Sequence, residues 1–443
     1  MYFRFARALC VLFVLGLSPL PSLAESLRVP TQTEVLTLSH ALAKALESSP
    51  ELAAFPATRR IVEAEKLQAS LYPNPSVGLE LENFAGSGNL RGGQALQSTL
   101  TLSQVIPLGQ KLERNVEVAT ARLGDVVADY DIARLDVLAE TARRYTDVAE
   151  AQARDVLARR SVELAENTLQ AVQRRVRAGA TSSAETSRAQ VALIQAQIDL
   201  QRAAAQLDAA RIALAAMWGA TEPSFEEIGA DLASLPPLKA FGEFVAAMEA
   251  GPRLHRYATT LRLREAELRL AKAQAVPDLT VSAGVRRLEH GATGANPDHG
   301  LVASLSLPLP FFDRNQGNIA AAHARIQQNE IERDATSLRL RTVLYGLYRA
   351  DQQARTRAQT LSREAIPQAD KALDLIERGY ARGAISFLDL LDAQRQSIAL
   401  QADVISARAD AHRLDTELER LSAQPVVAPL PTTSAITVDK GTP

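Results

Sequence analysis

The chain has 443 residues, which is enough for two or three ordinary domains. Its formal net charge is -2, so no basic field favours a nucleic-acid partner. One cysteine and a scatter of six histidines and three methionines argue against a disulfide framework and against a soft-metal cofactor site.

The first 24 residues have the pattern of a secretory signal peptide. Arg4 and Arg7 supply positive charge, "ALCVLFVLGL" at residues 8–17 is a short apolar core, and "SLA" at residues 22–24 fits a cleavage site. The core is too short to cross a bilayer as a helix, and no later stretch reaches the roughly 18 apolar residues that a membrane helix needs. Cys10 lies inside the core rather than at the cleavage point, which argues against a lipid anchor. We expect export of the cleaved chain.

Two halves of the remaining chain resemble each other. "VEAEKLQAS" at residues 62–70 is matched by "REAELRLAK" at 264–272, and "GATSSAETSRAQ" at 179–190 by "GAISFLDLLDAQ" at 383–394, each roughly two hundred residues later. The period is far too long for a solenoid, so it predicts an internal two-fold repeat. We expect a signal peptide 1–24, a first repeat 25–219, a linker 220–238, a second repeat 239–423 and a disordered tail 424–443.

Each repeat contains a predicted β-hairpin, at about residues 76–105 and 278–310. In "SVGLELENF" at 76–84, Val77, Leu79 and Leu81 share one face, and in "LTVSAGVRR" at 279–287 every second residue from Leu279 to Val285 is apolar. Strict alternation over about nine to eleven residues is typical of a transmembrane β-strand. A soluble two-hairpin sheet alternates in the same way, so periodicity leaves both structures open.

A very long helix is predicted after each hairpin. From about residue 113 to residue 178 there is no proline and a single glycine, and residues 318–379 repeat this with kinks expected at Gly346 and Pro367. The first helix alone would extend about 100 Å, which exceeds what a compact domain normally uses.

The helix that returns from each turn has two apolar seams. In the first repeat one seam contains Leu193, Leu200, Leu207 and Leu214, and the other contains Val191, Ile198, Ala205 and Ile212. Residues two apart are about 200° apart around a helix, so the seams lie on nearly opposite sides. Two opposite apolar seams indicate a helix that packs between two neighbours in a wall of helices, and we call such a helix a stave. The alternative is an amphipathic bundle helix with one broad apolar stripe.

Four strands cannot close a membrane barrel, because such barrels need about eight or more and open edges are not tolerated in lipid. If the predicted strands lie in a membrane, several chains must share one barrel. Three chains would give twelve strands. On that condition the fold is a mixed α/β membrane protein, with a long α-helical coiled-coil tunnel and four transmembrane strands per chain completing a 12-stranded barrel in a homotrimer.

The duplicated layout, the proline-flanked hairpins and "RGAISFLDLLDAQ" at residues 382–394 resemble the TolC-like outer membrane factor family over about residues 36–423. Within it, "LYPNPSVGLELENFAGSG" at 71–88 and "LPLPFFDRNQGNIAAA" at 307–322 are similar to the heavy-metal, cobalt-zinc-cadmium type efflux branch. The resemblance implies a passive homotrimeric duct in the cell outer membrane, with a helical tunnel in the periplasm. It also implies two partners, a periplasmic adaptor and an inner-membrane proton-driven pump of the resistance-nodulation-division type.

Two sets of site residues follow. A glycine ends each long helix and a serine can cap the next one, and the resemblance places these turns at the periplasmic end, where the adaptor docks. The predicted docking residues are Gly179, Ala180, Ser182, Gly383, Ala384 and Ser386. By resemblance, Asp389 and Asp392 ring the closed end of the tunnel as a cation-selective aperture. The alternative is that they are ordinary first-turn acids favoured by the helix dipole. The first copy has Glu185 and Arg188 at these positions.

Other functions receive less support from the residues. His290 and His299 flank the second hairpin loop, but two loop histidines are more often solvated than metal-bound, so no metal site or cofactor is predicted. No nucleophile–base pair or phosphate loop indicates an enzyme. A conduit for drugs or other organic compounds and a periplasmic coiled-coil scaffold remain as alternatives to a metal duct.

Overall fold

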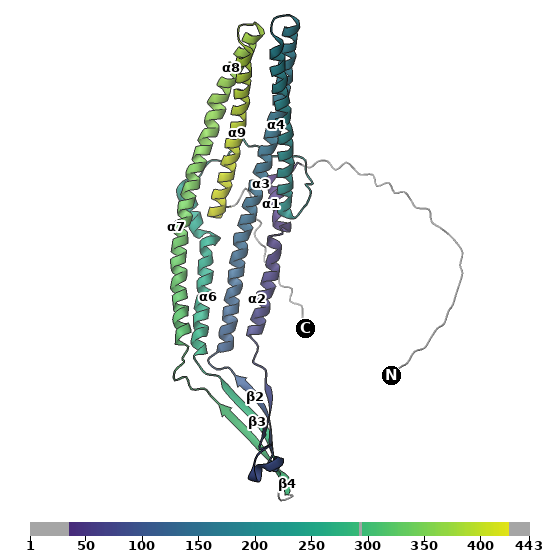
Figure 1. Cartoon of the computed structure of the whole chain (residues 1–443). Helices are drawn as coiled ribbons and strands as arrows, with labels where there is room; N and C mark the ends of the chain where they lie inside the picture. Colours follow the sequence, from purple (N-terminus) through teal and green to yellow (C-terminus); the bar gives the residue numbers. More distant parts are fainter. Residues whose placement is uncertain (1–34, 292–294, 425–443) are drawn as a thin grey trace, which may run out of the picture.

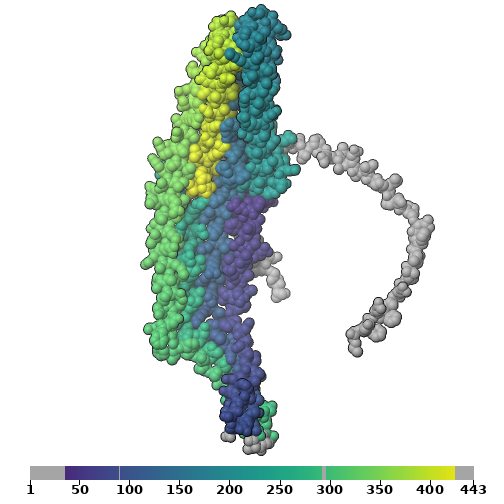
Figure 2. Space-filling model, viewed as in Figure 1, coloured from purple at the N-terminus to yellow at the C-terminus, as the bar shows by residue number. Residues whose placement is uncertain are grey.

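The computed structural model describes residues 35–291 and 295–424. The expected signal peptide with Cys10, and the expected tail beyond residue 424, lie outside these ranges. The molecule is long and narrow (Figure 2). A β-sheet lies at one end, and two turns that connect helices lie at the other (Figure 1).

The elements of the first half run from residue 38 to residue 218. In chain order they are α1 (Leu38–Ser48), the 3-10 turn η1 (Leu52–Ala54), α2 (Phe55–Ala69), β1 (Ser76–Glu82), η2 (Gly88–Gly93), β2 (Gln97–Ile106), α3 (Lys111–Arg177), α4 (Ser183–Ala215) and η3 (Ala216–Trp218).

The second half repeats this order with small differences. Its elements are α5 (Phe241–Ala250), α6 (Pro252–Gln274), β3 (Leu279–His290), β4 (Ala295–Ser306), α7 (Gln316–Thr360), the π-helical turn η4 (Leu361–Ala365), α8 (Ile366–Ala381) and α9 (Phe387–Ser422).

Helix α3 is the spine of the molecule. It has 67 residues without a break, as the lack of proline predicts, and it packs against α2, α4, α6 and α9. Its buried face includes Val137 and Val148, both fully buried. Within the described ranges, no helix combines the length and the apolar character that a membrane crossing requires.

The two kinks expected in the second long helix have different outcomes. Pro367 lies in the first turn of α8, directly after the π-helical turn η4, so the helix is disturbed there. A proline ring clashes with the carbonyl four residues earlier, here that of Arg363, and the wider π turn makes room for it. Gly346 was wrongly expected to kink the chain: α7 continues through it, because glycine keeps the backbone N–H that a helix needs.

The four strands form one antiparallel sheet in the order β1-β2-β3-β4. The central β2–β3 pair joins the two halves, since Leu100 lies opposite Val285. Leu79 and Leu301 extend this register to the outer strands. An apolar row therefore crosses the whole sheet, and these four side chains are 66%, 48%, 54% and 90% exposed from β1 to β4.

The opposite face of the sheet is polar, and its central strands approach each other closely. Ser103 shares a 2.8 Å hydrogen bond with Ser282, and Arg286 donates to the Thr99 hydroxyl at 3.2 Å. Gly284 lies so close to β2 that a Cβ atom there would be 2.3 Å from the Leu100 carbonyl oxygen. Only glycine permits this approach between the two central strands.

The segment that connects the halves lies along the helices rather than apart from them. Ile228 forms an isolated parallel bridge with Leu36, whose carbonyl accepts a 3.0 Å hydrogen bond from the Tyr145 hydroxyl. Further on, the Arg355 guanidinium donates to the Pro236 carbonyl and pairs with Asp351 at 2.7 Å. Helix α3, through Leu36, and helix α7 are thus both held to the segment that connects the halves.

Candidate functional site

The turn from α3 to α4 and the turn from α8 to α9, at the end opposite the sheet, have nearly the same geometry. Gly179 and Gly383 adopt left-handed φ angles of 70° and 78°. Ala180 N–H donates to the Arg175 carbonyl at 2.9 Å, and Ala384 N–H donates to the Gly379 carbonyl at 2.9 Å. This six-to-one hydrogen bond over a left-handed glycine is a Schellman motif, which satisfies carbonyls that the helix end would leave unpaired.

The turns α3–α4 and α8–α9 lie side by side at one end of the molecule (Figure 1). The six predicted docking residues lie there and all are exposed; they are Gly179, Ala180, Ser182, Gly383, Ala384 and Ser386. The structure therefore brings together two segments that are about two hundred residues apart in the chain.

The serine caps of the returning helices differ. Ser386 Oγ accepts a hydrogen bond from the Asp389 N–H at 3.2 Å and donates to the Asp389 carboxylate at 2.7 Å. Ser182 occupies the same position before α4, but its side chain forms no capping hydrogen bond. The sequence predicted side-chain caps at both turns, and only the second turn has one. The two turns differ because the Asp389 carboxylate accepts a hydrogen bond from the Ser386 hydroxyl and so holds that hydroxyl in its capping position.

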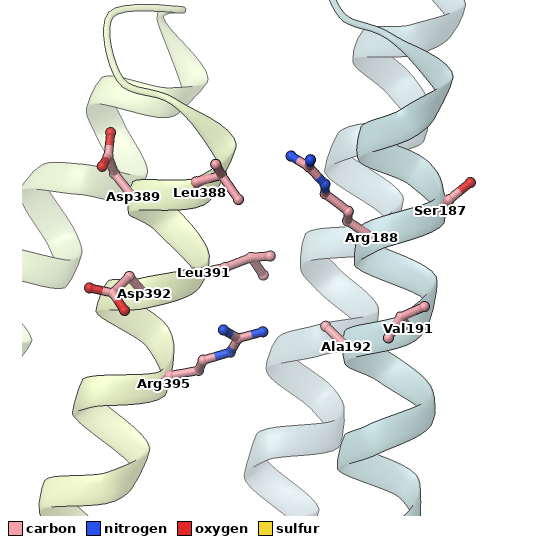
Figure 3. Close-up of a pocket in the computed structure, with 9 residues that line it drawn as sticks. All are labelled: Ser187, Arg188, Val191, Ala192, Leu388, Asp389, Leu391, Asp392 and Arg395. Carbon is pink, nitrogen blue, oxygen red and sulfur yellow. The ribbon is translucent and has the colours of Figure 1, made fainter.

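Asp389 and Asp392 lie on one exposed face of α9, one turn apart (Figure 3). They line a groove between α4 and α9 whose other walls include Arg188, Leu391 and Arg395. In the described part of the chain, neither aspartate forms an ion pair. Both carboxylates are therefore available to a cation or to another chain.

A contact that the sequence analysis missed joins the two turns. The Tyr380 hydroxyl of α8 donates to Glu185 Oε2 of α4 at 3.1 Å. The Arg175 guanidinium of α3 lies 4.5 Å from the centre of the Tyr380 ring and donates to the Tyr380 carbonyl. Burial, with the Glu185 carboxylate beside it, raises the pKa of Tyr380 to about 12, so the hydroxyl stays a hydrogen-bond donor at neutral pH.

An apolar cluster beneath this contact holds the turns together. Its buried members come from all four helices, and they are Leu169, Val172, Ala189, Leu193, Tyr380, Phe387, Leu390 and Leu391. The one sequence signal for the tyrosine is its place just before the turn glycine Gly383, where the first copy has Val176 instead. That difference between the copies indicates a specific role for Tyr380, but it does not predict which residue Tyr380 contacts.

The hairpin histidines lie at the other end of the molecule. His290 Nε2 is 3.3 Å from Asp298 Oδ2, and His299 is exposed in β4 opposite Arg287. Across residues 35–291 and 295–424, no group of three or more His, Cys, Asp or Glu side chains has the arrangement of a metal site.

Comparison with known proteins decides the family. The sequence profile of the family described as outer membrane efflux protein matches residues 41–220 and again residues 245–424. The chain belongs to the outer membrane efflux protein family. Members are outer-membrane channels with a periplasmic helical tunnel, so this protein is an efflux channel of the outer membrane rather than a free periplasmic scaffold.

Named relatives of this efflux protein include metal-resistance proteins. It is 30% identical to the cobalt-zinc-cadmium resistance protein CzcC of Cupriavidus metallidurans over 87% of this chain and 90% of the relative. It is 26% identical to the nickel-cobalt-cadmium resistance protein NccC of Alcaligenes xylosoxydans over 67% of this chain and 66% of the relative. The crystal structure of CusC shares its fold with a TM-score of 0.68 at 16% identity, covering 87% of this chain and 91% of CusC.

Proposed function

We propose that three copies of this chain form a passive duct that exports heavy-metal cations through the outer membrane. The duct receives its cargo from a periplasmic adaptor and an inner-membrane proton-driven pump, and the chain itself performs no catalysis. The observation that carries the choice of cargo is the 30% identity to CzcC, a cobalt-zinc-cadmium resistance protein, over 87% of the chain. NccC, named for nickel, cobalt and cadmium, supports the same class of cargo.

The sheet supports a shared barrel. Its order leaves β1 and β4 as open edges within one chain, and lipid does not tolerate unpaired strand edges. Three copies supply twelve strands, with β4 of one chain pairing with β1 of the next. The exposed apolar row from Leu79 to Leu301 then faces lipid, and the polar face with Arg286 and Glu80 lines the lumen.

The returning helix α4 supports a wall of staves. One of its predicted seams is mostly buried within the chain: Leu193, Leu207 and Leu214 are 8%, 7% and 0% exposed, and Leu200 is half-buried. The other seam is open, since Val191 and Ile198 are 66% and 45% exposed. Because such an apolar seam is costly in water, we assign it to contact with a neighbouring protomer.

The turns support both predicted site roles. The six docking residues would receive the tips of adaptor helices. With three copies around one axis, Asp389 and Asp392 supply six carboxylates to a constriction, which attracts cations as acidic rings do in cation channels. The contact of Tyr380 with Glu185 holds the turns of one protomer together and so favours a narrow opening.

The two halves support an origin by duplication. The family profile matches twice, and each half contains a pair of helices, a hairpin, a long helix, a left-handed glycine turn and a returning helix. We assign residues 25–219 and 239–423 to the two copies and residues 220–238 to the linker. The copies differ at the turn, where the first has Glu185 and Arg188 in place of the two aspartates.

The experiment is deletion of the gene from its host, followed by growth on cobalt, zinc, cadmium, nickel and a panel of organic toxicants. We expect tolerance to the metals to fall and a plasmid copy to restore it. Sensitivity to organic compounds alone would instead favour the alternative conduit. Unchanged tolerance to every compound would contradict an export role.

A further inference from the structure

The groove between α4 and α9 opens beside the two turns and has a volume of about 740 Å³. Figure 3 shows its lining in close-up. Ala192 and the buried Leu391 form its floor, and Val191 and Leu388, at 66% and 56% exposure, form apolar rims. The lining thus offers a few apolar side chains at the end of the molecule where docking is proposed.

Two arginines extend into this groove from opposite sides. Arg188 points from α4 toward α9, and Arg395 points from α9 toward α4 (Figure 3). Neither guanidinium forms an ion pair or a side-chain hydrogen bond in the described part of the chain. The groove lining also includes Asp389 and Asp392, but their carboxylates project to the side of α9 away from the two guanidinium groups (Figure 3). Because the two arginines face each other and repel, an anion between them would be stabilised.

Arginines that bridge elements elsewhere in the chain are paired. Arg413 of α9 binds Asp147 of α3 at 2.8 Å, and Arg420 of α9 binds Asp136 of α3 at 2.8 Å. Arg355 of α7 reaches Asp415 of α9 at 3.2 Å. The two groove arginines differ from these three in having no such partner within the described part of the chain.

We propose that Arg188 and Arg395 together bind a carboxylate side chain on the helical hairpin of the adaptor. The planar guanidinium group suits bidentate recognition of a carboxylate, and two of them from different helices would fix its position. The matching partner surface is a helix with an Asp or Glu beside small and apolar residues, which rest on Ala192 and Leu391. The pair would then set which adaptor the duct accepts, because a basic residue at that place would be repelled.

This inference rests on the proposed docking of an adaptor at the turns, and it adds the chemistry of the contact. Its test uses the full chain in its host, with a toxic compound to which the deletion strain is sensitive. The compound is chosen after screening metals and organic toxicants, so the choice of cargo does not affect the result. A deletion strain sensitive to none of them overturns both proposals.

The first measurement compares the variant R188E/R395E with the native chain. We expect tolerance to fall to the level of the deletion strain, while the amount of assembled protein in the outer membrane stays the same. R188A/R395A should keep assembly and lose part of the tolerance, since loss of a charge-assisted contact weakens binding by about tenfold to a hundredfold. R188K/R395K keeps the charge and should lose less than R188A/R395A.

The matched control is Q396E. It places a new glutamate on α9, one residue after Arg395 and about 100° around the helix, outside the groove lining. Tolerance should be unchanged. Full tolerance in R188E/R395E, or an equal loss in Q396E, would overturn the proposal.

The second measurement selects suppressors of R188E/R395E for restored tolerance. We expect them in the adaptor, as changes from Asp or Glu to Lys or Arg on one face of its helical hairpin. Suppressors confined to Asp389 or Asp392 of the duct would overturn the proposal, because the arginines would then pair between protomers of the duct itself.

Discussion

Tyr380 is the residue at which the second turn touches the first. Its hydroxyl donates to Glu185 at 3.1 Å, its carbonyl accepts from Arg175, and its ring lies 4.5 Å from that guanidinium group. Three interactions between α3, α4 and α8 therefore meet at this one residue. Removal of the hydroxyl alone isolates one of them while leaving the ring in the apolar cluster.

We expect Tyr380→Phe to raise the single-channel conductance of the duct in planar bilayers. A hydrogen bond to a charged group contributes about 1.5–3 kcal/mol, so its loss should let the turns separate more often. Tyr345→Phe, at a tyrosine of α7 that is 55% exposed, is the control and should leave conductance unchanged. Equal conductance in the native chain and Tyr380→Phe would show that this contact does not restrain the opening.

Glu419 is a second residue with an unusual environment. It lies near the end of α9, where burial, together with repulsion from Asp415, raises its pKa to about 7, against the opposing attraction of Lys239. The folded state therefore holds this proton at a pH where the unfolded chain, whose glutamates have the ordinary pKa of 4.5, has released it. Stability from this group is present below about pH 4.5 and is lost as pH rises through about 7.

Glu419→Gln should remove that pH dependence, because glutamine is neutral throughout. In thermal unfolding followed by circular dichroism, we expect the variant to melt higher than the native chain at pH 8 and to differ little at pH 5. Glu417→Gln is the control: it breaks an ion pair with Arg420 and should not stabilise the chain at pH 8. A variant that melts no higher than the native chain at pH 8 would contradict the raised pKa of Glu419.

Among the elements, the central strand pair β2–β3 depends on close packing. A Cβ atom at Gly284 would be 2.3 Å from the Leu100 carbonyl oxygen and 2.8 Å from Thr101 Cγ2. Backbone atoms cannot give way as a flexible side chain does. The strands would have to move apart at the very place where the two halves of the chain are joined into one sheet.

Gly284→Ala should therefore reduce the yield of assembled, heat-resistant oligomer in outer-membrane extracts analysed by gel electrophoresis. Overpacking of this kind costs about 1–3 kcal/mol. Gly300→Ala is the matched control in β4, since nothing lies within 4 Å of a Cβ at that position. Similar yields for the two variants would mean that the sheet adjusts to the extra methyl group.

The first turn of α9 is the element that distinguishes the second copy from the first. In planar bilayers, a trivalent hexammine cation added on the periplasmic side should block the native duct. The double variant Asp389→Ala with Asp392→Ala should lose most of that block and part of its cation preference, because the carboxylates on the axis are gone. Asp403→Ala, further along α9 and paired with Arg357 at 3.6 Å, should retain both.

The block should also weaken with added salt, as screening shortens to about 8 Å near 0.15 M. If the double variant keeps its block and its ion preference, the aspartates lie off the axis. They would then be first-turn acids stabilised by the helix dipole and by the Ser386 cap.

At the scale of the whole molecule, a single chain is incomplete. Both sheet edges are open, and large apolar side chains are exposed on strands and helices alike, with Leu301 at 90% and Phe312, in the loop after β4, at 94%. These surfaces need lipid or further copies of the chain to cover them. The assembled duct, rather than the protomer, is therefore the unit whose stability matters.

We expect native mass spectrometry in detergent to give three chains per particle. Four strands from each chain then complete a barrel of twelve without an open edge. A monomer that stays folded and monodisperse in detergent would contradict the shared barrel, and a different number of copies would change the strand count of the barrel.

Local patterns determined much of this protein from the sequence by itself. The absence of proline predicted the unbroken α3. Alternation predicted the strands and put Leu79 and Val285 each on the apolar face of its own strand. Gly179 and Gly383 marked the turns. Each of these depends on the backbone preferences of neighbouring residues, which the sequence states directly. The same local rules placed Asp389 and Asp392 on one face of a helix.

The tertiary structure alone decided which distant residues meet. The pairing of β2 with β3, the contact of Tyr380 with Glu185 and Arg175, and the two arginines across the α4–α9 groove all join residues from different halves of the chain. Such contacts depend on how long helices pack side by side, and a small rotation of one helix would replace every partner. Helix periodicity fixes which residues share a face, but packing of the whole molecule chooses what that face meets.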